Sequence, residues 1–267
     1  MNSRLYCVIG YPVKHSLSPK LHNGRFKKLK IKARYFQEEV KPEKLGEFMR
    51  GFKEKYSGAN VTIPHKEKVM KFLDEVAPEA KKIGAVNVIV NRDGKLVGHN
   101  TDVVGAIAAL KSDVKIIKGQ YAVILGAGGA ARAVIYGLKN AGSHVLILNR
   151  TVENAEKLAA EFDCKFGALE DFDATNCDIL INTTSVGMWP KIEETPLPNL
   201  KENLRAANKK PVVMDVIYRP KMTRMLKDAK ACGCKVVIGE KMFLAQAAES
   251  FKLWVGKTPT SSGTPRR

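Results

Sequence analysis

A glycine-rich segment that separates a strand-like run from a helix-like run has the composition of a dinucleotide-binding turn. The segment reads Gly126, Ala127, Gly128, Gly129, Ala130 and Ala131. The first glycine allows a tight turn, the second lets the backbone approach a pyrophosphate, and the small sixth residue permits close helix–strand packing. Amides at the helix N-terminus would then hold the phosphates. A purely structural glycine turn is the alternative, and the strand–helix–strand context favours the nucleotide.

The end of the second strand of this unit indicates which dinucleotide is bound. NAD enzymes usually present an acidic residue there to the ribose 2′-hydroxyl. This chain has Asn149, Arg150 and Thr151 instead. A guanidinium with neighbouring amide and hydroxyl donors attracts a 2′-phosphate, so these residues favour NADP over NAD. The same residues also fit an exposed arginine at a helix start with Thr151 as the N-cap, and both interpretations can hold together.

Hydroxyl groups near the start of another predicted helix have the chemistry of a carboxylate site. Ser16 and Ser18 lie in a polar loop and are followed by Pro19. Short donors beside the positive end of a helix favour an anion without a buried cation. For Ser18 a structural role is sufficient, since it would be the N-cap of a helix from about 18 to 29 with Pro19 at the first helical position.

Other polar side chains lie near the ends of short predicted strands. Thr62 and Lys66 occur at the end of the predicted strand 59–63, the usual place of ligands in open α/β folds. Asn87 and Asp102 lie in two further polar segments. Considered alone, Lys66 fits a solvated lysine and Asp102 fits a helix cap, so no single segment establishes a catalytic site.

The order of predicted elements indicates an α/β protein with two domains. Up to about residue 115, short apolar runs alternate with helical patterns, which implies a mostly parallel sheet covered by helices. A cleaner strand–helix–strand unit begins at Tyr121, and a last helix is predicted from about 242 to 255. Further strands are predicted near 178–181, 212–215 and 235–238.

Nine of these segments together resemble the shikimate dehydrogenase family, from residue 10 to residue 256. The matching segments are 15–19, 60–66, 84–87, 100–102, the loop that starts at Gly126, 149–151, 182–188, 215–218 and 239–246. Each segment alone gives modest support, and nine in the family's order and spacing give strong support.

The resemblance implies an NADP-dependent oxidoreductase that reversibly reduces 3-dehydroshikimate to shikimate, a step on the chorismate route to aromatic amino acids. It also implies an N-terminal α/β substrate domain and a C-terminal Rossmann-like NADP-binding domain with a cleft between them. The limits that we expect are 1–111 for the substrate-binding and catalytic domain, 112–239 for the Rossmann domain, 240–256 for a C-terminal helix packed back on the substrate domain, and 257–267 for a flexible tail.

The resemblance also assigns roles to particular residues. Lys66 and Asp102 would form the catalytic pair, because hydride arriving at a ketone carbon creates an alkoxide that an ammonium can stabilise and protonate. The implied substrate-binding residues are Ser16 and Ser18 with Tyr218 for the carboxylate, and Thr62, Lys66, Asn87, Asp102 and Gln246 for the ring hydroxyls and the reacting group. The implied cofactor-binding residues are Gly126, Ala127, Gly128, Gly129, Ala130, Asn149, Arg150, Thr151, Thr184, Ser185, Val186, Met188, Val216, Gly239 and Met242.

Two positions depart from the commoner family pattern. Val103 stands where many members have glycine, and His65 precedes Lys66 where others have an aromatic residue. Neither change removes a proposed catalytic group.

Composition limits the other classes of function. The chain has 267 residues with 45 Lys+Arg and 27 Asp+Glu, a formal net charge of +18. No apolar run approaches the roughly 20 residues of a membrane span, and the first residues do not fit a secretory signal. The five cysteines form no disulfide framework, which indicates a cytoplasmic protein. The histidines and carboxylates show no ligand spacing, so no metal is expected.

Two alternatives remain open at this point. A quinate/shikimate dehydrogenase that uses NAD is the first, and Arg150 argues against it. A non-catalytic nucleotide- or nucleic-acid-binding protein would explain the charge, but it would leave residues such as Ser16, Lys66 and Asp102 without a shared purpose. Because the lysines lack aromatic interleaving, we expect a small-molecule substrate and neither a nucleic-acid nor a membrane partner. The sequence allows a monomer or a homodimer.

Overall fold

The computed structural model describes residues 3–114 and 117–257, and the chain separates into two compact units. Unit 1 contains the chain up to Thr101 and again from Ala247, and unit 2 contains Asp102–Gln246. Of the predicted flexible tail, residues 258–267 lie outside the described residues. The domain limits given above stay predictions. No helix in the described parts of the chain is long and apolar enough to cross a membrane.

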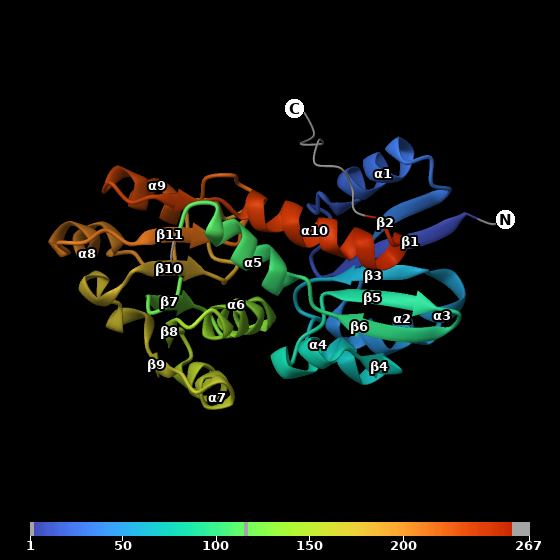
Figure 1. The fold of residues 1–267 in the computed structure, drawn as a ribbon, viewed down its shortest axis with the longest axis horizontal. Coiled ribbons are helices and arrows are strands. Elements are labelled where there is room, and N and C mark those ends of the chain that lie inside the picture. The colour runs from blue at the N-terminus through green and yellow to red at the C-terminus, as the bar shows by residue number, and fades with distance from the viewer. Residues whose placement is uncertain (1–2, 115–116, 258–267) are drawn as a thin grey trace. The chain divides into compact units, whose positions relative to one another are not determined.

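Unit 1 is built on a mixed six-stranded sheet (Figure 1). Its strands are β1 (Arg4–Gly10), β2 (Ala33–Glu39), β3 (Gly58–Val61), β4 (Glu75–Val76), β5 (Val88–Arg92) and β6 (Lys95–His99), in the spatial order β2-β1-β3-β5-β6-β4. The pairs β1–β2, β1–β3 and β4–β6 are parallel, and β5 runs antiparallel to both of its neighbours. Asp93 and Gly94 form the turn that joins β5 to β6.

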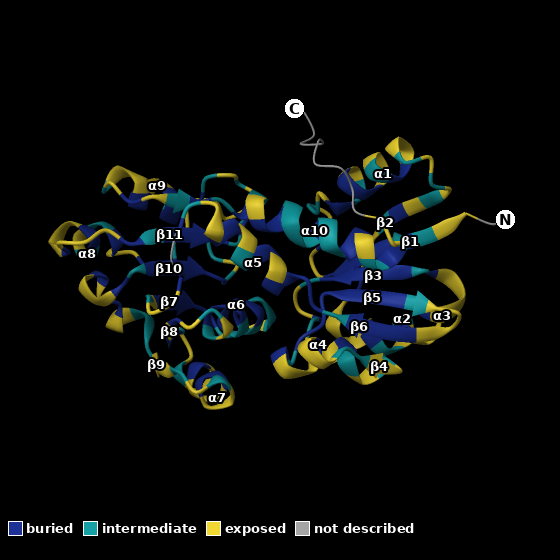
Figure 2. Cartoon of the chain, in the orientation of Figure 1, coloured by how far each residue is buried: buried dark blue, intermediate teal, exposed yellow. Residues whose placement is uncertain are grey.

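Strand β1, the second strand of this sheet, is buried on both faces. Tyr6 and Val8 point into one cluster with residues of α1 (Ser18–Lys28), while Cys7 and Ile9 point into the opposite cluster. Helices α2 (Leu45–Arg50), α3 (Phe52–Lys55) and α4 (Pro78–Ile83) contribute to that second cluster. Figure 2 shows β3, β5 and β6 as largely buried.

From sequence, Pro42 is expected to open a single helix that runs to about Lys55, and this prediction is wrong. The segment forms a 3-10 turn, Pro42–Lys44, followed by α2 and α3, which are separated at Gly51. Glycine is a weak helix former, and Gly51 is the C-cap residue of α2, so the backbone leaves the helix there.

The C-terminal part of α10 (Gly239–Val255) belongs to unit 1. Trp254 lies 5.1 Å from the ring of Tyr6, and its Nε1 donates a hydrogen bond of 3.0 Å to the carbonyl of Ile89. Phe251 packs on Phe26 at 5.4 Å. The helix begins three residues before the predicted start near residue 242.

Unit 2 is a doubly wound parallel sheet, so the Rossmann-like prediction is confirmed (Figure 1). Its strands are β7 (Tyr121–Leu125), β8 (His144–Leu148), β9 (Lys165–Gly167), β10 (Ile179–Asn182), β11 (Val212–Asp215) and β12 (Val236–Val237). The order β12-β11-β10-β7-β8-β9 reverses between β7 and β10, and ligands of such sheets bind outside the carboxyl ends of the strands at this reversal.

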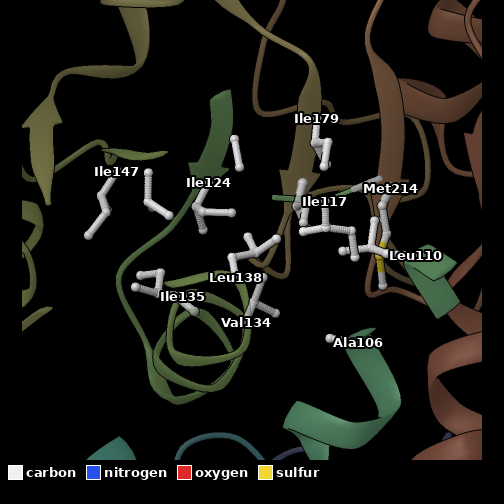
Figure 3. Close-up of a cluster of buried hydrophobic side chains, with 14 of the residues drawn as sticks. Ala106, Leu110, Ile117, Ile124, Val134, Ile135, Leu138, Ile147, Ile179 and Met214 are labelled. Carbon is white, nitrogen blue, oxygen red and sulfur yellow. The ribbon is translucent and has the colours of Figure 1, made fainter. Parts of the chain in front are cut away.

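Helices cover both faces of this sheet. They are α5 (Asp102–Lys111), α6 (Gly129–Asn140), α7 (Val152–Phe162), α8 (Leu200–Ala206) and α9 (Arg224–Ala231). Val134 and Leu138 of α6 face Ile124 of β7 and Ile179 of β10 in one buried cluster (Figure 3). The other face carries α8 and α9, with Leu204 and Leu226 in its cluster.

One histidine in the core of unit 1 gives a pH-dependent prediction. His22 is 0 % exposed, and neither ring nitrogen has a hydrogen-bond partner in the described part of the chain. Its ring stacks on Tyr35 at 4.7 Å and lies 5.1 Å from Trp254. Burial, with a smaller contribution from the charge of Arg25, holds the pKa of His22 well below its usual value.

We expect this histidine to destabilise the protein at acid pH. The unfolded chain protonates His22 near pH 6.5 whereas the folded chain does not, so the free energy of unfolding falls as the pH drops below that value. Urea unfolding at pH 7.5 and 5.5 should show a loss of about 1.4 kcal/mol from this group. His22→Met should remove this loss of about 1.4 kcal/mol. If the free energy of unfolding of the variant falls with pH as steeply as that of the parent, His22 is not its cause.

Candidate active site

The strand directions of unit 1 gather several sequence-predicted residues at one edge of the sheet. Val88, the first residue of β5, lies opposite Asn60 of β3 and His99 of β6. Since β5 is antiparallel, the chain just before β5 lies beside the chain just after β3 and β6. Thr62 and Asn87 are therefore placed at the same edge, where β1 also ends and the loop with Ser16 begins.

The loop after β1 places the two predicted carboxylate ligands at the start of α1. The prediction that Ser18 is the N-cap, with Pro19 at the first helical position, is wrong by one residue, because α1 begins at Ser18 and Leu17 is the N-cap residue. Leu17 already has helical backbone angles, φ −86° and ψ −7°. The hydroxyl of Ser16 accepts a hydrogen bond of 3.3 Å from the amide of Ser18. Both serines thus lie at the positive end of α1, as a carboxylate site requires.

Two side chains of strand β2 form hydrogen bonds with the backbone of this loop. The side-chain amide of Gln37 donates to the carbonyls of Lys14, at 3.2 Å, and Ser16, at 2.9 Å. Two residues further along β2, the carboxylate of Glu39 accepts a bond of 3.4 Å from the amide of Val13. Sequence reasoning missed both residues, because their partners are 21 to 26 positions away along the chain.

Gln37→Ala should therefore weaken substrate binding without disturbing chemistry. Removal of both bonds to the loop loosens Ser16, so we expect KM for shikimate to rise roughly threefold to tenfold, in line with one or two neutral hydrogen bonds. We expect kcat to stay within about twofold, since this loop is predicted to bind the substrate carboxylate and not the reacting group. Arg34→Ala on the same strand is the control, because Arg34 packs over Phe36 instead. Equal effects of the two variants would refute the role of Gln37.

The segment with Lys66 is fixed by its backbone and by His65. His65 is 0 % exposed, and its Nε2–H donates a bond of 2.6 Å to the carbonyl of Val40. Burial lowers the pKa of His65, and the bond to Val40 offsets part of that effect. The carbonyl of Lys66 accepts a bond of 2.8 Å from the amide of Val86. The histidine that replaces an aromatic residue here thus anchors the chain beside the partly buried Lys66.

A buried hydrogen-bond network fixes Asn87 and the segment before Asp102. The amide oxygen of Asn87 accepts from the backbone of Thr101 at 2.7 Å, and its nitrogen donates to the Thr101 hydroxyl at 3.0 Å. Thr101 also contacts the hydroxyl of Ser250 at 3.1 Å. Asp102 is the first residue of α5 and is 5 % exposed. Asn87 thus fixes both the backbone and the hydroxyl of Thr101.

Three members of this network were missed in the sequence. Ser250 accepts a bond of 3.1 Å from the side chain of Asn60, whose oxygen accepts one of 2.7 Å from the hydroxyl of Tyr35. The partners are up to 190 positions apart, so no local pattern could have indicated them.

In unit 2 the glycine turn has the geometry of a phosphate cradle. Gly126 has φ +107°, and a Cβ there would lie 2.9 Å from atoms of both Thr183 and Thr184. A Cβ on Gly128 would meet nothing within 4 Å, so the space before this backbone is open. The helix α6 begins at the next residue, Gly129, without a side-chain cap. The backbone amides at the start of α6, those of Gly129 and Ala130, suit the pyrophosphate of a dinucleotide.

The residues predicted to bind a 2′-phosphate lie directly after β8. Asn149 donates a side-chain bond of 2.8 Å to the carbonyl of Thr151, and Arg150 is exposed between them. Thr151 occupies the N-cap position of α7, as predicted, although its hydroxyl makes no capping bond. The guanidinium of Arg150 is thus open to solvent at a carboxyl end of the sheet.

The remaining predicted cofactor residues lie in the segments that follow β10 and β11 and at the start of α10. The hydroxyl of Thr184 donates to Asn182 at 2.7 Å and accepts from the amide of Val186 at 3.1 Å. Ser185 is exposed, whereas Met188 and Val216 are partly buried. A Cβ on Gly239 would lie 2.6 Å or less from backbone atoms of Val216 and Ile217, so these two segments are in direct backbone contact.

The first turns of α10 carry the last predicted residues of unit 2. Met242 is 6 % exposed, and its carbonyl would lie 2.9 Å from a Cβ at Gly105 of α5. Gln246 is partly buried, and its side-chain amide donates a hydrogen bond of 3.1 Å to the carbonyl of Phe243. The ring of Phe243 in turn lies 4.7 Å from that of Tyr218.

Comparison with known proteins identifies the family. The family model "Shikimate dehydrogenase substrate binding domain" matches residues 8–89, and "Shikimate / quinate 5-dehydrogenase" matches residues 108–217. The chain is 45% identical over 270 residues to shikimate dehydrogenase (NADP(+)) of Thermococcus kodakarensis, covering 96% of this chain and 93% of that protein. The chain belongs to the shikimate dehydrogenase family.

Two further members support this result. The shikimate dehydrogenase (NADP(+)) of a Bacillus cereus strain is 44% identical over 265 residues, which cover 96% of this chain and 94% of the relative. The crystal structure of shikimate 5-dehydrogenase from Thermus thermophilus, in complex with NADP(H) and shikimate, matches with a TM-score of 0.86 and 39% identity, covering 96% of this chain and 95% of that one. The predicted family and fold class are confirmed, and the roles of individual residues stay predictions.

Proposed function

We propose that the protein is an NADP-dependent shikimate dehydrogenase that reversibly reduces 3-dehydroshikimate to shikimate. The observation that carries the proposal is the convergence of Ser16, Thr62, Lys66 and Asn87 on one edge of the unit 1 sheet. Membership of the family supports the reaction, because its relatives are named for it and one was solved with both NADP(H) and shikimate. The reaction is a step in aromatic amino acid biosynthesis.

The substrate carboxylate is bound at the start of α1. Ser16 and Ser18 present hydroxyls at the positive end of this helix, and Tyr218 supplies a third hydroxyl. Thr62, Asn87, Asp102 and Gln246 hold the ring hydroxyls. Asn87 is in addition held by Thr101, so its amide is preorganised before substrate arrives.

Lys66 and Asp102 form the acid–base pair. NADPH, when bound, supplies the hydride for the ketone carbon. The ammonium of Lys66 stabilises the alkoxide that develops on the substrate oxygen and then transfers a proton to it. Asp102 orients Lys66 and the neighbouring hydroxyl. In shikimate oxidation the neutral amine of Lys66 removes the hydroxyl proton.

The cofactor is held by the carboxyl ends of the unit 2 strands. The turn 126–130 takes the pyrophosphate on the amides at the start of α6, and its open Gly128 fits that role. Asn149, Arg150 and Thr151 take the 2′-phosphate. Thr184, Ser185, Val186, Met188, Val216, Gly239 and Met242 line the nicotinamide.

Absorbance at the nicotinamide band tests this proposal. Purified protein with shikimate should reduce NADP much faster than NAD, and quinate should be the poorer substrate. Silence with both cofactors would refute the reaction, and turnover of quinate with NAD alone would refute the substrate and cofactor while leaving the family intact. Binding of nucleotide without any turnover would instead favour a non-catalytic binding protein.

Location and assembly extend the proposal. The five cysteines are free, which supports the cytoplasm as the location. We expect a monomer or a homodimer, with no nucleic-acid and no membrane partner. Light scattering coupled to size exclusion distinguishes the two assembly states.

A further inference from the structure

Asp215, at the carboxyl end of β11, is a buried acid without a cation beside it. It is 0 % exposed, and no lysine, arginine or histidine of the described residues is paired with it. Its Oδ1 accepts a bond of 2.9 Å from the amide of Ile217. Its Oδ2 accepts from the side-chain amide of Asn182, at 3.1 Å, and from the hydroxyl of Thr223, at 2.8 Å.

These bonds join two neighbouring strand ends. Asn182 and Asp215 face each other in the parallel register of β10 and β11. The oxygen of Asn182 accepts from the amide of Thr184 at 3.0 Å, and its nitrogen donates to the carbonyl of Val186 at 3.3 Å. One side of the network therefore fixes the segment after β10, and Asp215 fixes the segment after β11.

Backbone contact leaves these segments little freedom. Gly239 lies directly against the carbonyls of Val216 and Ile217, so a displaced 216–217 segment would collide with the start of α10. The position of Thr223 is also fixed, because its hydroxyl caps α9 by accepting a hydrogen bond of 3.3 Å from the amide of Leu226. The network thus connects the ends of β10 and β11 with the start of α9.

The network is costly as a purely structural device. Burial raises the pKa of Asp215 to about 7, and its three hydrogen bonds offset only part of that rise. Moving an ionisable carboxyl from water to the protein interior costs free energy that its hydrogen bonds must offset. Costly buried polar groups that are fully hydrogen-bonded often serve to specify one local geometry.

We propose that Asp215 is a positioning residue that, through Asn182 and Ile217, holds the segments 183–188 and 216–217 in the geometry that binds the nicotinamide half of NADP. This inference rests on the proposed function, because those segments are assigned to the cofactor there. Asp215 itself does not touch substrate or cofactor in this scheme.

Asp215→Asn tests the proposal with a minimal change. The new side chain keeps its oxygen toward Ile217 but turns its amide toward the amide of Asn182, donor against donor. Isothermal titration should show an NADP⁺ dissociation constant raised about tenfold. KM for shikimate should rise less, to about threefold at most, because Tyr218 is the one proposed substrate ligand next to this network. The exchange Asn182→Asp with Asp215→Asn restores one donor and one acceptor between the two side chains, but residue 182 then no longer donates to the carbonyl of Val186. It should therefore recover part of the lost affinity and bring the dissociation constant to within about fivefold of the parent value.

Ser143→Ala is the matched control. Its buried hydroxyl donates a bond of 2.9 Å to the carbonyl of Ile117, just before β8 and therefore at the opposite edge of the sheet. This variant should lower the unfolding temperature and leave NADP⁺ affinity unchanged, as expected for a bond with a structural role alone.

The outcomes separate this proposal from the proposed function. Unchanged NADP⁺ affinity in Asp215→Asn, or failure of the exchange variant to recover it, overturns the positioning role. An unmodified protein that does not bind NADP⁺ overturns the proposed cofactor and this inference together. The positioning role is supported if NADP⁺ affinity is weakened in Asp215→Asn, is partly recovered in the exchange variant and is unchanged in Ser143→Ala.

Discussion

Lys66→Ala should lower kcat by roughly 10²-fold to 10⁴-fold, the usual contribution of a positioned acid–base group. The loss is expected because the alkoxide formed at the substrate would have neither an ammonium beside it nor a proton donor. KM for shikimate should change less than kcat, since the serines at the start of α1 and the amide of Asn87 still bind substrate. The measurement is steady-state absorbance of NADPH in both directions.

Two further variants make this result specific. Lys68→Ala removes an exposed lysine two residues away and should leave kcat unchanged, which excludes a general effect of lost charge. Lys66→Arg keeps a positive charge that does not release its proton near neutral pH, so it should remain strongly impaired. If Lys66→Ala kept more than a tenth of the parent kcat, Lys66 could not be the catalytic acid and base.

The elements near the cofactor could be predicted well from sequence. The strands β7 and β8 are apolar runs bounded by polar or glycine residues, and α6 follows a glycine turn, so local patterns suffice to define them. The segment 42–55 was misjudged because its amphipathic pattern continues past Gly51, where the backbone leaves the helix. Periodicity reports which face is buried, and it does not show where a helix is interrupted.

The site was predictable only for residues that sit in a recognisable segment. Ser16, Lys66 and Asn87 belong to short polar segments that follow or precede strands, and the sheet brings those segments to one edge. The residues that hold them have no such signal. Gln37 and Ser250 are ordinary polar residues in the sequence, and their roles depend on pairings that exist only after the chain has folded.

Arg150→Gln should change the choice of cofactor more than a removal of charge at any other position in unit 2. Charge-assisted hydrogen bonds contribute about 1.5 to 3 kcal/mol, so kcat/KM for NADP should fall roughly tenfold to 150-fold. NAD lacks the 2′-phosphate, and its kcat/KM should stay within about threefold. The ratio of the two values, measured with shikimate saturating, reports the interaction directly.

The exposure of Arg150 makes a control for long-range charge necessary. Lys157→Gln removes a positive charge from the exposed face of α7, the helix that begins just after Arg150. It should alter NADP kinetics only slightly, and any effect should vanish in high salt, because exposed charges at a distance are screened. Arg150→Asp should have a still larger effect, since a carboxylate repels the 2′-phosphate of NADP and accepts a hydrogen bond from the ribose 2′-hydroxyl of NAD. This variant should prefer NAD, and an unchanged preference for NADP would place the 2′-phosphate away from Arg150.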